Sequence, residues 1–400
     1  MTMQISQLLP TAFLGLASQS PLTFASGAAK SEVVSFKQTG SRHSYGGKAI
    51  CTTGDATVTV NATNLVFSGS TTASQYEVSG ILQEALQINS TWTADHTNGT
   101  VAVTGPFKIS VQLCLPITEN TAEVKTVQVL THGLGLDHTY WDIAQDYSYV
   151  DAAAEAGHAT LMYDRLGLGG SDHPDPSVIQ SFVHVEVLAA LVGALKTDTY
   201  GSHHFSKIAC VGHSYGSFIQ IGHDVKYPNV CDAAILTGFG SDLTHVAQSV
   251  LAGDATVARD VDAARFGDLP GGYLTNPNAA SLMVYYRYPY YDTRLFEQQL
   301  PIAGSTFSLA DVITSGLILA PAKDHTKPVQ VVLGQYDFTF CSGDCSKTAD
   351  PTIGAIKAFY PDAEVGEGYI VPTSGHCINN HYAAGEAFAH MLEFLKEQGL

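Results

Sequence analysis

Basic residues are scarce in this chain. Its 400 residues include 19 Lys and Arg against 37 Asp and Glu, which gives a formal net charge of −18 at pH 7 with histidine neutral. Nucleic-acid binding relies on clustered Lys and Arg side chains that neutralise phosphates. The shortage of these residues argues against a nucleic-acid partner, and we expect the acidic surface to serve solubility.

Long apolar runs are also missing. The apolar segment at residues 8–17 is too short to span a bilayer, and small residues follow it. No Lys or Arg precedes the segment, so a disordered tail is the alternative interpretation of residues 1–29, but the pattern is typical of a secretory signal peptide and leader. Three sequons, at Asn61, Asn89 and Asn98, agree with export. We therefore expect a secreted, glycosylated protein without a membrane span.

Cysteine is present in an odd number, seven, so at least one should be unpaired in an oxidising compartment. Cys341 and Cys345 are separated by a short, turn-like spacer and are the first candidates for a disulfide. Cys51 and Cys114 flank the β-rich N-terminal segment and form a second candidate pair.

The other three cysteines give weaker signals. Cys210 lies inside an apolar strand and is interpreted as a buried small hydrophobic residue. The partners of Cys231 and Cys377 cannot be read from the sequence. No second Cys or His pair at zinc-ligand spacing accompanies Cys341 and Cys345. We expect neither a metal nor another cofactor.

Residues 30–120 alternate β-branched and polar residues between Gly, Asn and Ser turns. A period of two indicates half-buried antiparallel strands, as at 56–60 and 101–104. A further strand is expected at 108–114, where the segment reaches the main sheet. We interpret residues 30–120 as a β-rich N-terminal extension, with a separately folded binding module as the alternative.

From Val124 onward, strands alternate with helices, which favours a mostly parallel α/β sheet with flanking helices. The predicted strands are 126–130, 159–163, 207–211, 233–237, 329–333 and 369–371, and the predicted helices are 147–156, 182–195 and 383–396.

The stretch 238–327 is longer than the usual connection in a compact domain. An insertion here would lie over the carboxyl ends of the strands, where open α/β sheets bind ligands. We interpret it as a helical cap, which leaves 121–237 and 328–400 as the core.

The segment Cys210-Val211-Gly212-His213-Ser214-Tyr215-Gly216 follows an apolar strand and precedes a helix-compatible run. This is the G-x-S-x-G pattern of a nucleophile elbow, in which a sharp turn exposes a serine hydroxyl. An ordinary glycine-rich turn is the alternative, but the flanking strand and helix make it the weaker interpretation.

With the elbow, a His-Gly turn at 132–133 and a later acid and histidine, residues 124–400 resemble the α/β-hydrolase family. The segment 164–171, Asp-Arg-x-Gly-x-Gly-x-Ser, is similar to a loop often seen there. The stretch 113–141 looks like that of a secreted fungal subgroup. The resemblance implies an α/β-hydrolase fold and the chain order Ser, Asp, His for the catalytic residues.

Carried onto this sequence, the resemblance implies Ser214 as nucleophile, His376 as base and Asp337 as the acid that orients it. The main rivals are Asp242, at an alternative acid position, and His381, which we expect to cap or line the last helix. Haloalkane dehalogenases and epoxide hydrolases look like relatives by fold, but a resemblance to them implies an aspartate nucleophile. The serine at this elbow therefore sets the chain apart from both.

The oxyanion of a tetrahedral intermediate needs donors, and the resemblance assigns them to the backbone N–H groups of Leu134 and Tyr215. We expect His132 and His213 to be structural residues behind the site. The substrate pocket is expected to include Leu134 as an apolar wall.

Further lining of the pocket is expected from His138, Tyr285 and Tyr286. The last two belong to a tyrosine-rich run at 285–291 that suits an apolar or aromatic substrate, although for most of these rings we favour packing of the cap against the core.

These residues predict a serine hydrolase that cleaves a carboxylic ester or lactone of a small apolar or aromatic molecule through an acyl-enzyme. Two other classes stay open. The same residues would serve an acyltransferase or cyclase of natural-product biosynthesis, and the elbow would also be compatible with a binding protein that has no turnover.

Overall fold

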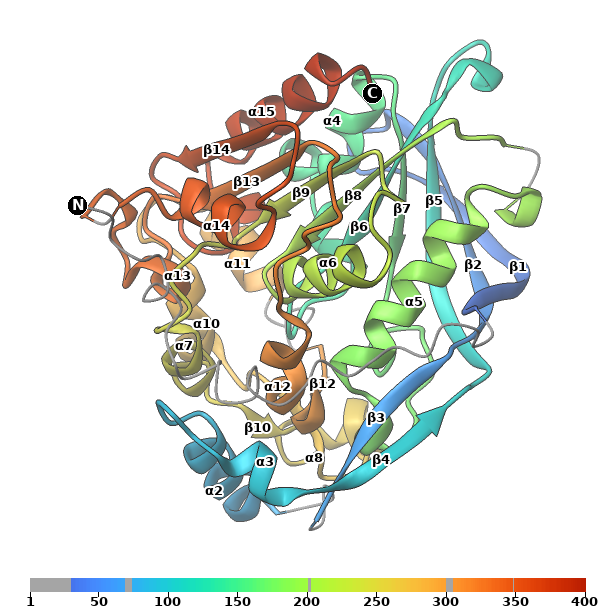
Figure 1. Cartoon of the computed structure of the whole chain (residues 1–400). Coiled ribbons are helices and arrows are strands. Elements are labelled where there is room, and N and C mark those ends of the chain that lie inside the picture. The colour runs from blue at the N-terminus through green and yellow to red at the C-terminus, as the bar shows by residue number, and fades with distance from the viewer. Residues whose placement is uncertain (1–29, 69–73, 201–202, 300–304, 348) are drawn as a thin grey trace.

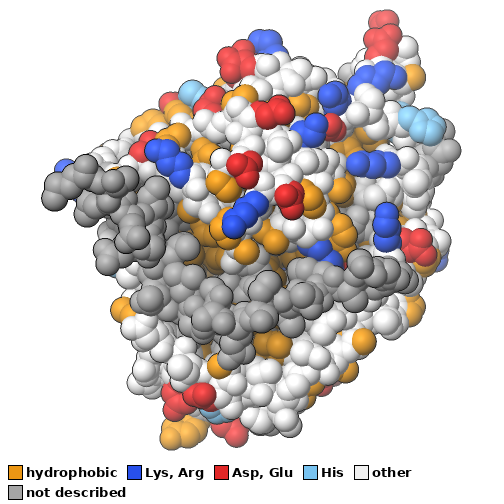
Figure 2. Space-filling view, in the orientation of Figure 1, with side chains coloured by type: hydrophobic (Ala, Val, Ile, Leu, Met, Phe, Trp, Pro, Cys, Tyr) orange, Lys and Arg blue, Asp and Glu red, His pale blue; other side chains and the backbone are white. Residues whose placement is uncertain are grey.

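The computed structural model describes residues 30–68, 74–200, 203–299, 305–347 and 349–400 (Figure 1). The expected signal peptide and leader at 1–29 lie outside the described residues. Within the described part of the chain, no helix is long and apolar enough to cross a membrane. On the face drawn in Figure 2, acidic and basic side chains are intermixed.

A nine-stranded sheet forms the centre of the protein, with the strand order β1-β2-β5-β7-β6-β8-β9-β13-β14. From β7 to β14 in this order, every strand pairs in parallel with its neighbours. Strand β2 is antiparallel to both of its neighbours, β1 and β5, and β5 is antiparallel to β7. The strands are β1 (Glu32–His43), β2 (Ala49–Thr59), β5 (Phe107–Pro116), β6 (Thr126–Thr131), β7 (Ala159–Tyr163), β8 (Lys207–His213), β9 (Ala233–Thr237), β13 (Val329–Gly334) and β14 (Gly366–Val371). The sheet is mostly parallel, which confirms the predicted fold class.

Helices cover both faces of this sheet (Figure 1). Side chains alternate between the faces of a strand, so Val127 and Val129 of β6 enter one hydrophobic core and Leu130 enters the other. Burial on both faces explains why these strands are almost continuously apolar. One core includes residues of α5 (Ser181–Ala194), α6 (Tyr215–Lys226) and α14 (Pro351–Phe359), and the other includes residues of α4 (Tyr149–Glu155) and α15 (Ala384–Glu397).

The region at 30–120 contains two helices that the period-two pattern did not predict. Between β2 and β5 the chain forms β3 (Ala62–Phe67), α2 (Gln75–Ala85), α3 (Trp92–His96) and β4 (Thr97–Val103). Helix α2 begins with a capping box, in which Ser74 and Glu77 bond reciprocally to each other's backbone N–H. Its apolar residues Val78 and Leu82 pack with insertion residues such as Leu274 in a third hydrophobic cluster. The extension therefore supports the insertion as well as the sheet.

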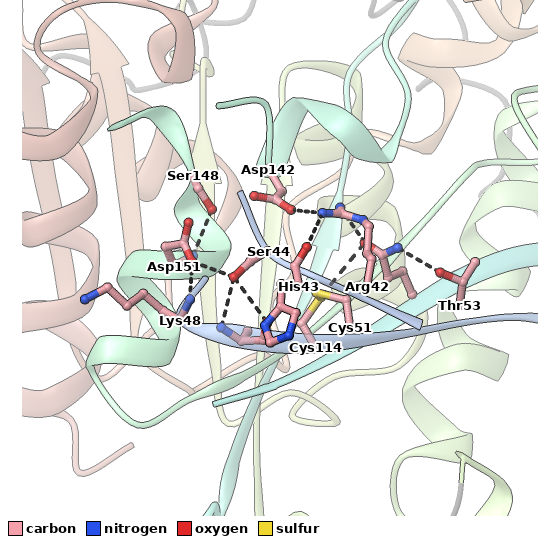
Figure 3. The surroundings of a disulfide bond; sticks show 12 residues. Arg42, His43, Ser44, Lys48, Cys51, Thr53, Cys114, Asp142, Ser148 and Asp151 are labelled. Atoms are coloured by element: carbon pink, nitrogen blue, oxygen red, sulfur yellow. Dashed lines mark hydrogen bonds and ion pairs between the residues drawn. A yellow bond between two sulfur atoms is a disulfide. The ribbon is translucent and has the colours of Figure 1, made fainter. Parts of the chain in front are cut away.

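The N-terminal hairpin is fixed to the core around the disulfide Cys51–Cys114, which joins directly paired residues of β2 and β5 (Figure 3). Arg42 forms a 2.7 Å ion pair with the buried carboxylate of Asp142. The Ser44 hydroxyl donates to Oδ1 of Asp151 on α4 at 2.6 Å. These contacts connect β1 and β2 to the segments that follow β6.

Two further disulfides lie within the α/β region. Cys341–Cys345 was predicted, as was Cys51–Cys114, and both predictions are confirmed. The interpretation of Cys210 as a buried small hydrophobic residue is wrong, because its sulfur is bonded to that of Cys231. Cys210 lies on β8 beside β9 in the sheet, and Cys231 lies two residues before β9, so the fold brings the two together.

The cysteine outside these pairs, Cys377, is free and buried.

The stretch 238–327 forms short helices and a three-stranded sheet with the order β10-β11-β12. Its elements are α7 (Val246–Ala252), β10 (Thr256–Val257), α8 (Ala258–Val261), α9 (Ala263–Phe266), β11 (Tyr273–Thr275), α10 (Ala279–Leu282), α11 (Thr293–Gln299), β12 (Phe307–Ser308) and α12 (Leu309–Thr314). After β13, helix α13 (Phe338–Cys341) precedes α14.

Candidate active site

Ser214 occupies the tight turn between β8 and α6. Its backbone has φ 53° and ψ −117°, a conformation that L-residues rarely adopt. A Cβ on Gly216 would lie 2.2 Å from the carbonyl oxygen of Thr131, and one on Gly212 would lie 2.5 Å from that of Gly216. Only glycine fits at these two positions, because β6 closely approaches Gly216 and the start of α6 closely approaches Gly212.

The structure brings Ser214, His376 and Asp337 into one connected line. Nε2 of His376 lies 2.8 Å from Oγ of Ser214. Nδ1 of the same ring lies 2.7 Å from Oδ2 of Asp337. The imidazole and the carboxylate are buried and the serine is half-buried. A serine, a histidine and an aspartate thus lie in the geometry that nucleophilic catalysis by a serine would require.

Asp337 is held in place by the helix that follows it. Its Oδ1 accepts the backbone N–H of Phe340 at 2.9 Å as the N-cap of α13, which leaves Oδ2 for His376. The rival acid Asp242 instead accepts the N–H of Thr244 at 2.9 Å. The structure does not place Asp242 on the histidine.

His381 supports the loop that carries His376. Its Nε2 accepts the backbone N–H groups of Gly375 at 3.1 Å and Arg287 at 2.9 Å, while Nδ1 lies 2.8 Å from the carbonyl oxygen of Cys377. Burial lowers the pKa of His381 to about 4, so the ring is neutral near pH 7. This ring connects the base loop to the insertion.

The segments that carry the two expected oxyanion donors both adjoin Ser214. Tyr215 is the first residue of α6, where the backbone N–H has no acceptor within the helix. Leu134 lies in the turn after β6, and a Cβ on the preceding Gly133 would be 3.2 Å from Cβ of Ser214. A substrate carbonyl at Ser214 would therefore approach both segments.

His132 and His213, which we expected to be structural residues behind the site, are both fully buried, and His213 also contributes to the wall of the cavity described below. His213 stacks on Tyr140 with a centroid distance of 4.3 Å, and its Nδ1 lies 3.1 Å from Oγ1 of Thr237. Nε2 of His132 accepts the N–H of Arg165 at 3.1 Å. Burial first, and nearby positive groups second, hold the pKa of both histidines well below the ordinary value. Neutral rings in these positions are poor proton acceptors near pH 7.

A cavity of about 70 Å³ opens beside Ser214 between the core and the insertion. Its walls are mostly apolar. Among the expected pocket residues, Leu134, Tyr285 and Tyr286 line it. The remaining lining is Gly133, Gly135, Leu136, His213, Ser214, Tyr215, Phe218, Val246, Ser249, Val250, Asn276, Leu282, Val312, Ser315, Thr339, Phe340, His376 and Cys377.

His138 is not among the residues that line the cavity. Its Nδ1 lies 2.6 Å from Oδ1 of Asp164, and its backbone N–H donates to the same oxygen at 3.1 Å. Burial alone would raise the pKa of Asp164, but His138 and the N–H of Gly170 lower it to about 2. The ionised carboxylate of Asp164 therefore turns His138 away from the expected pocket.

Sequence reasoning missed most of the cavity wall. Val246 and Val250 of α7 and Leu282 of α10 line it from the insertion, and Phe340 lines it from α13. These helices are too short to show a clear 3.6-residue hydrophobic period in the sequence, so the sequence did not indicate which of their residues would face the cavity. Phe340 had a usable signal, since it lies three residues after the expected acid, Asp337, where the backbone N–H of a following helix would donate to an N-capping carboxylate.

Among the residues that the structure describes, two groups of side chains have donor atoms close enough together for a metal ion. They are Asp137, His138 and Asp164, and His223, Asp224 and Cys231. The first group is already used in hydrogen bonds between His138 and Asp164 and between Asp137 and Thr139. In the second, the sulfur of Cys231 is in a disulfide. Neither arrangement favours a metal.

A mostly parallel sheet with a nucleophile elbow defines the class of α/β hydrolases, and the comparisons place the chain in it. Residues 128–390 match the model of the alpha/beta hydrolase family, so the chain belongs to that family. A search of curated proteins found no relative for the chain.

Solved structures of similar fold include the alpha/beta hydrolase GrgF from Penicillium, at 19% identity and a TM-score of 0.49, with 73% of this chain and 95% of that chain covered. A thermophilic esterase from Thermogutta terrifontis is 16% identical, with a TM-score of 0.47 and coverages of 73% and 94%. A monoacylglycerol lipase from Paleococcus ferrophilus is 15% identical, with a TM-score of 0.47 and coverages of 68% and 94%.

Proposed function

We propose that the protein is a serine hydrolase that cleaves a carboxylic ester or lactone of a small apolar or aromatic molecule through an acyl-enzyme. The observation that carries this proposal is the continuous contact from Ser214 Oγ to His376 Nε2, at 2.8 Å, and from His376 Nδ1 to Asp337 Oδ2, at 2.7 Å. Family membership agrees with hydrolysis as the reaction class.

In the first half of the reaction, Ser214 Oγ attacks the substrate carbonyl while His376 Nε2 accepts the hydroxyl proton. Collapse of the tetrahedral intermediate breaks the bond to the leaving alkoxide, which takes the proton back from His376 as an alcohol. In the second half, His376 deprotonates a water molecule that attacks the acyl-enzyme, and Ser214 is released with the proton. Asp337 orients the ring and stabilises its charged form.

The negative charge that develops on the carbonyl oxygen would be stabilised by the N–H groups of Leu134 and Tyr215. The loss of one such donor in a serine hydrolase typically lowers kcat by about a hundredfold or more. Because both donors are backbone groups, their directions depend on the neighbouring structure rather than on their own side chains.

The cavity limits the acyl group. At about 70 Å³ it is well below the roughly 300 Å³ or more that drug-sized ligands occupy. An engineered cavity of about 150 Å³ accepts benzene. A short acyl chain therefore fits this cavity. Larger parts of a substrate would have to lie outside the cavity.

The proposal is tested with p-nitrophenyl esters of increasing acyl length. We expect turnover to be highest for acetate to butyrate and to fall steeply for octanoate. Ser214→Ala should lower kcat by about a millionfold, and His376→Ala by a similar amount. Full activity in both variants would exclude this mechanism, because no other serine and histidine of the described residues share this contact in the cavity.

The same assay separates hydrolysis from acyl transfer. Products formed in H₂¹⁸O should carry one ¹⁸O in the released acid if water is the acceptor. Ester exchange with added alcohols, or ring closure without ¹⁸O, would instead identify an acyltransferase or cyclase. A wild-type protein whose Ser214 resists a fluorophosphonate probe would be a binding protein.

We also propose that the protein is exported through an oxidising compartment. Three disulfides within the described residues support this, since such bonds are rare in the cytosol. The sequon asparagines Asn89 and Asn98 are exposed. Expression in a eukaryotic secretory host should give a protein in the medium whose mass falls on treatment with a peptide N-glycosidase. Retention in the cytosol with reduced cysteines would contradict this.

A further inference from the structure

A buried pair of opposite charges lies behind the two expected oxyanion donors. Arg165 follows β7 in the core, and Asp311 lies on α12 of the insertion. Neither side chain has measurable solvent exposure, and Nη1 of Arg165 lies 3.7 Å from Oδ2 of Asp311. Neither residue lines the cavity, so this pair has no direct access to a substrate.

The pair holds the side chain of Tyr215. The Tyr215 hydroxyl donates to Oδ1 of Asp311 at 3.0 Å and lies 2.7 Å from the hydroxyl of Ser181. The guanidinium of Arg165 lies over the same ring, 4.7 Å from its centroid. Because Tyr215 is the first residue of α6, a fixed side chain also fixes the direction of its backbone N–H.

The pair also reaches the other donor through a peptide plane. Nη2 of Arg165 donates to the carbonyl oxygen of Gly133 at 3.2 Å, and Nδ1 of His132 lies 3.0 Å from the same oxygen. That carbonyl belongs to the same planar, trans peptide unit as the N–H of Leu134, and the two groups point in opposite directions. Holding the Gly133 oxygen therefore directs the Leu134 N–H, and donation to the oxygen polarises it.

Helix α12 is itself fixed to the core by buried hydrogen bonds. The Ser308 hydroxyl donates to the carbonyl of Ile179 at 2.7 Å, and the Thr306 hydroxyl donates to that of Gly167 at 2.7 Å. Nε2 of His184 on α5 lies 2.9 Å from Oδ1 of Asp311. These contacts place the Asp311 carboxylate at one position relative to Arg165 and Tyr215.

We infer that Asp311 is a positioning residue through which the insertion holds both oxyanion donors in place, directly through Tyr215 and indirectly through Arg165 and Gly133. The inference deepens the proposed function and rests on it. Its consequence is that the insertion takes part in transition-state stabilisation as well as in forming the cavity wall.

The decisive variant is Tyr215→Phe, which removes the hydroxyl that contacts Asp311 but keeps the ring beneath Arg165 and the backbone N–H. We expect kcat for p-nitrophenyl acetate to fall about tenfold with KM changed by less than about twofold, since a small displacement of a donor weakens transition-state binding selectively. Asp311→Asn should lower kcat by about a hundredfold. In each variant, the rate at which a fluorophosphonate labels Ser214 should fall by a factor similar to the fall in kcat.

Tyr360→Phe is the matched control. The Tyr360 hydroxyl donates to Oδ2 of Asp224 on α6 at 2.9 Å, and both side chains are buried, but neither lines the cavity. This variant loses the same kind of buried Tyr–Asp hydrogen bond. It should lower the melting temperature as much as Tyr215→Phe does while leaving kcat and the labelling rate unchanged.

The inference is overturned if Tyr215→Phe keeps kcat and the labelling rate within twofold of the wild type while losing thermal stability as the control does. Should Asp311→Asn fail to fold, Tyr215→Phe alone decides the outcome. A wild-type protein that neither turns over esters nor is labelled at Ser214 overturns the proposed function itself, which distinguishes the two failures.

Discussion

The backbone and the side chain of Leu134 have different expected roles in the candidate site. Its backbone N–H is an expected oxyanion donor, while its half-buried side chain lines the cavity. Truncating the side chain should leave the N–H in place, because Arg165 and His132 hold the peptide unit from the Gly133 side. The two contributions can therefore be separated by a single substitution.

We predict that Leu134→Ala shifts the preference toward longer acyl groups. The lost side-chain volume adds to a cavity of about 70 Å³. The ratio of kcat/KM for p-nitrophenyl hexanoate to that for the acetate should rise at least about tenfold, since one or two methylenes in an apolar pocket discriminate by that order. Leu251→Ala, an exposed position on α7 outside the cavity, is the control. An unchanged ratio in Leu134→Ala would show that this wall does not limit the acyl group.

Among single residues, the sequence best predicted those of the candidate catalytic set, because the family resemblance implies the chain order Ser, Asp, His for them. Ser214, Asp337 and His376 each follow a strand end, and parallel strands bring such ends to one edge of the sheet. His138 also follows a strand, but the carboxylate of Asp164, far away in sequence, decides its direction. An ion pair of this kind has no local signature, so the pocket prediction failed at His138.

Among the elements, the elbow between β8 and α6 has the least tolerance for change. We predict that Gly216→Ala lowers the free energy of unfolding by about 2 kcal/mol or more, because the new Cβ would lie 2.2 Å from the Thr131 carbonyl of β6. Gly193→Ala, in α5, is the matched control. A Cβ there meets no atom within 4 Å, so the change should stabilise by about 0.5 to 1 kcal/mol. Urea denaturation measures both, and equal effects would contradict the steric argument.

The disulfides differ in the length of chain that they close. Cys210–Cys231 spans 21 residues and Cys341–Cys345 spans 4. Loop-closure entropy predicts a loss of about 3 kcal/mol when the first is replaced by two alanines and about 2 kcal/mol for the second. Urea denaturation of the two double variants under oxidising conditions gives the comparison. A larger loss for the shorter loop would mean that strain or packing dominates.

The elements themselves followed from periodicity wherever both faces of a strand are buried, and the predicted strands 159–163 and 233–237 agree with β7 and β9 residue by residue. Helix α2 was missed because alternation in the neighbouring strands dominated the segment, although the Ser74 and Glu77 spacing is a helix-start signal. The pairing of Cys210 with Cys231 depends on which strands become neighbours, which one sequence does not state.

The whole molecule should lose stability on acidification. The folded pKa of His381 is about 4, below its ordinary 6.5, so between these values only the unfolded chain binds the proton. Stability from this group is complete above pH 6.5 and is lost as the pH falls toward 4, by up to about 3 kcal/mol. The lowered pKa values of His132, His213 and Asp164 act in the same direction, whereas the raised pKa of His138 acts in the opposite one.

We therefore predict that the urea midpoint falls between pH 7 and pH 4.5. His381→Gln should be less stable at pH 7, because the hydrogen bonds from Gly375 and Arg287 are weakened, but its midpoint should fall less steeply with acid. Parallel curves for the variant and the wild type would assign the acid sensitivity to the other buried groups.

The positions of the candidate catalytic residues along the chain determine the order in which they are made during synthesis. Ser214 and its turn lie 162 residues before His376, and the strands that precede the acid and the base, β13 and β14, come last in the chain and pair in order onto β9. The N-terminal part of a chain leaves the ribosome first, and a domain generally folds as a unit. Ser214 is therefore synthesised before His376, and under the proposed mechanism a nascent chain is inert until its final segment has docked. Ester turnover would then report completed folding.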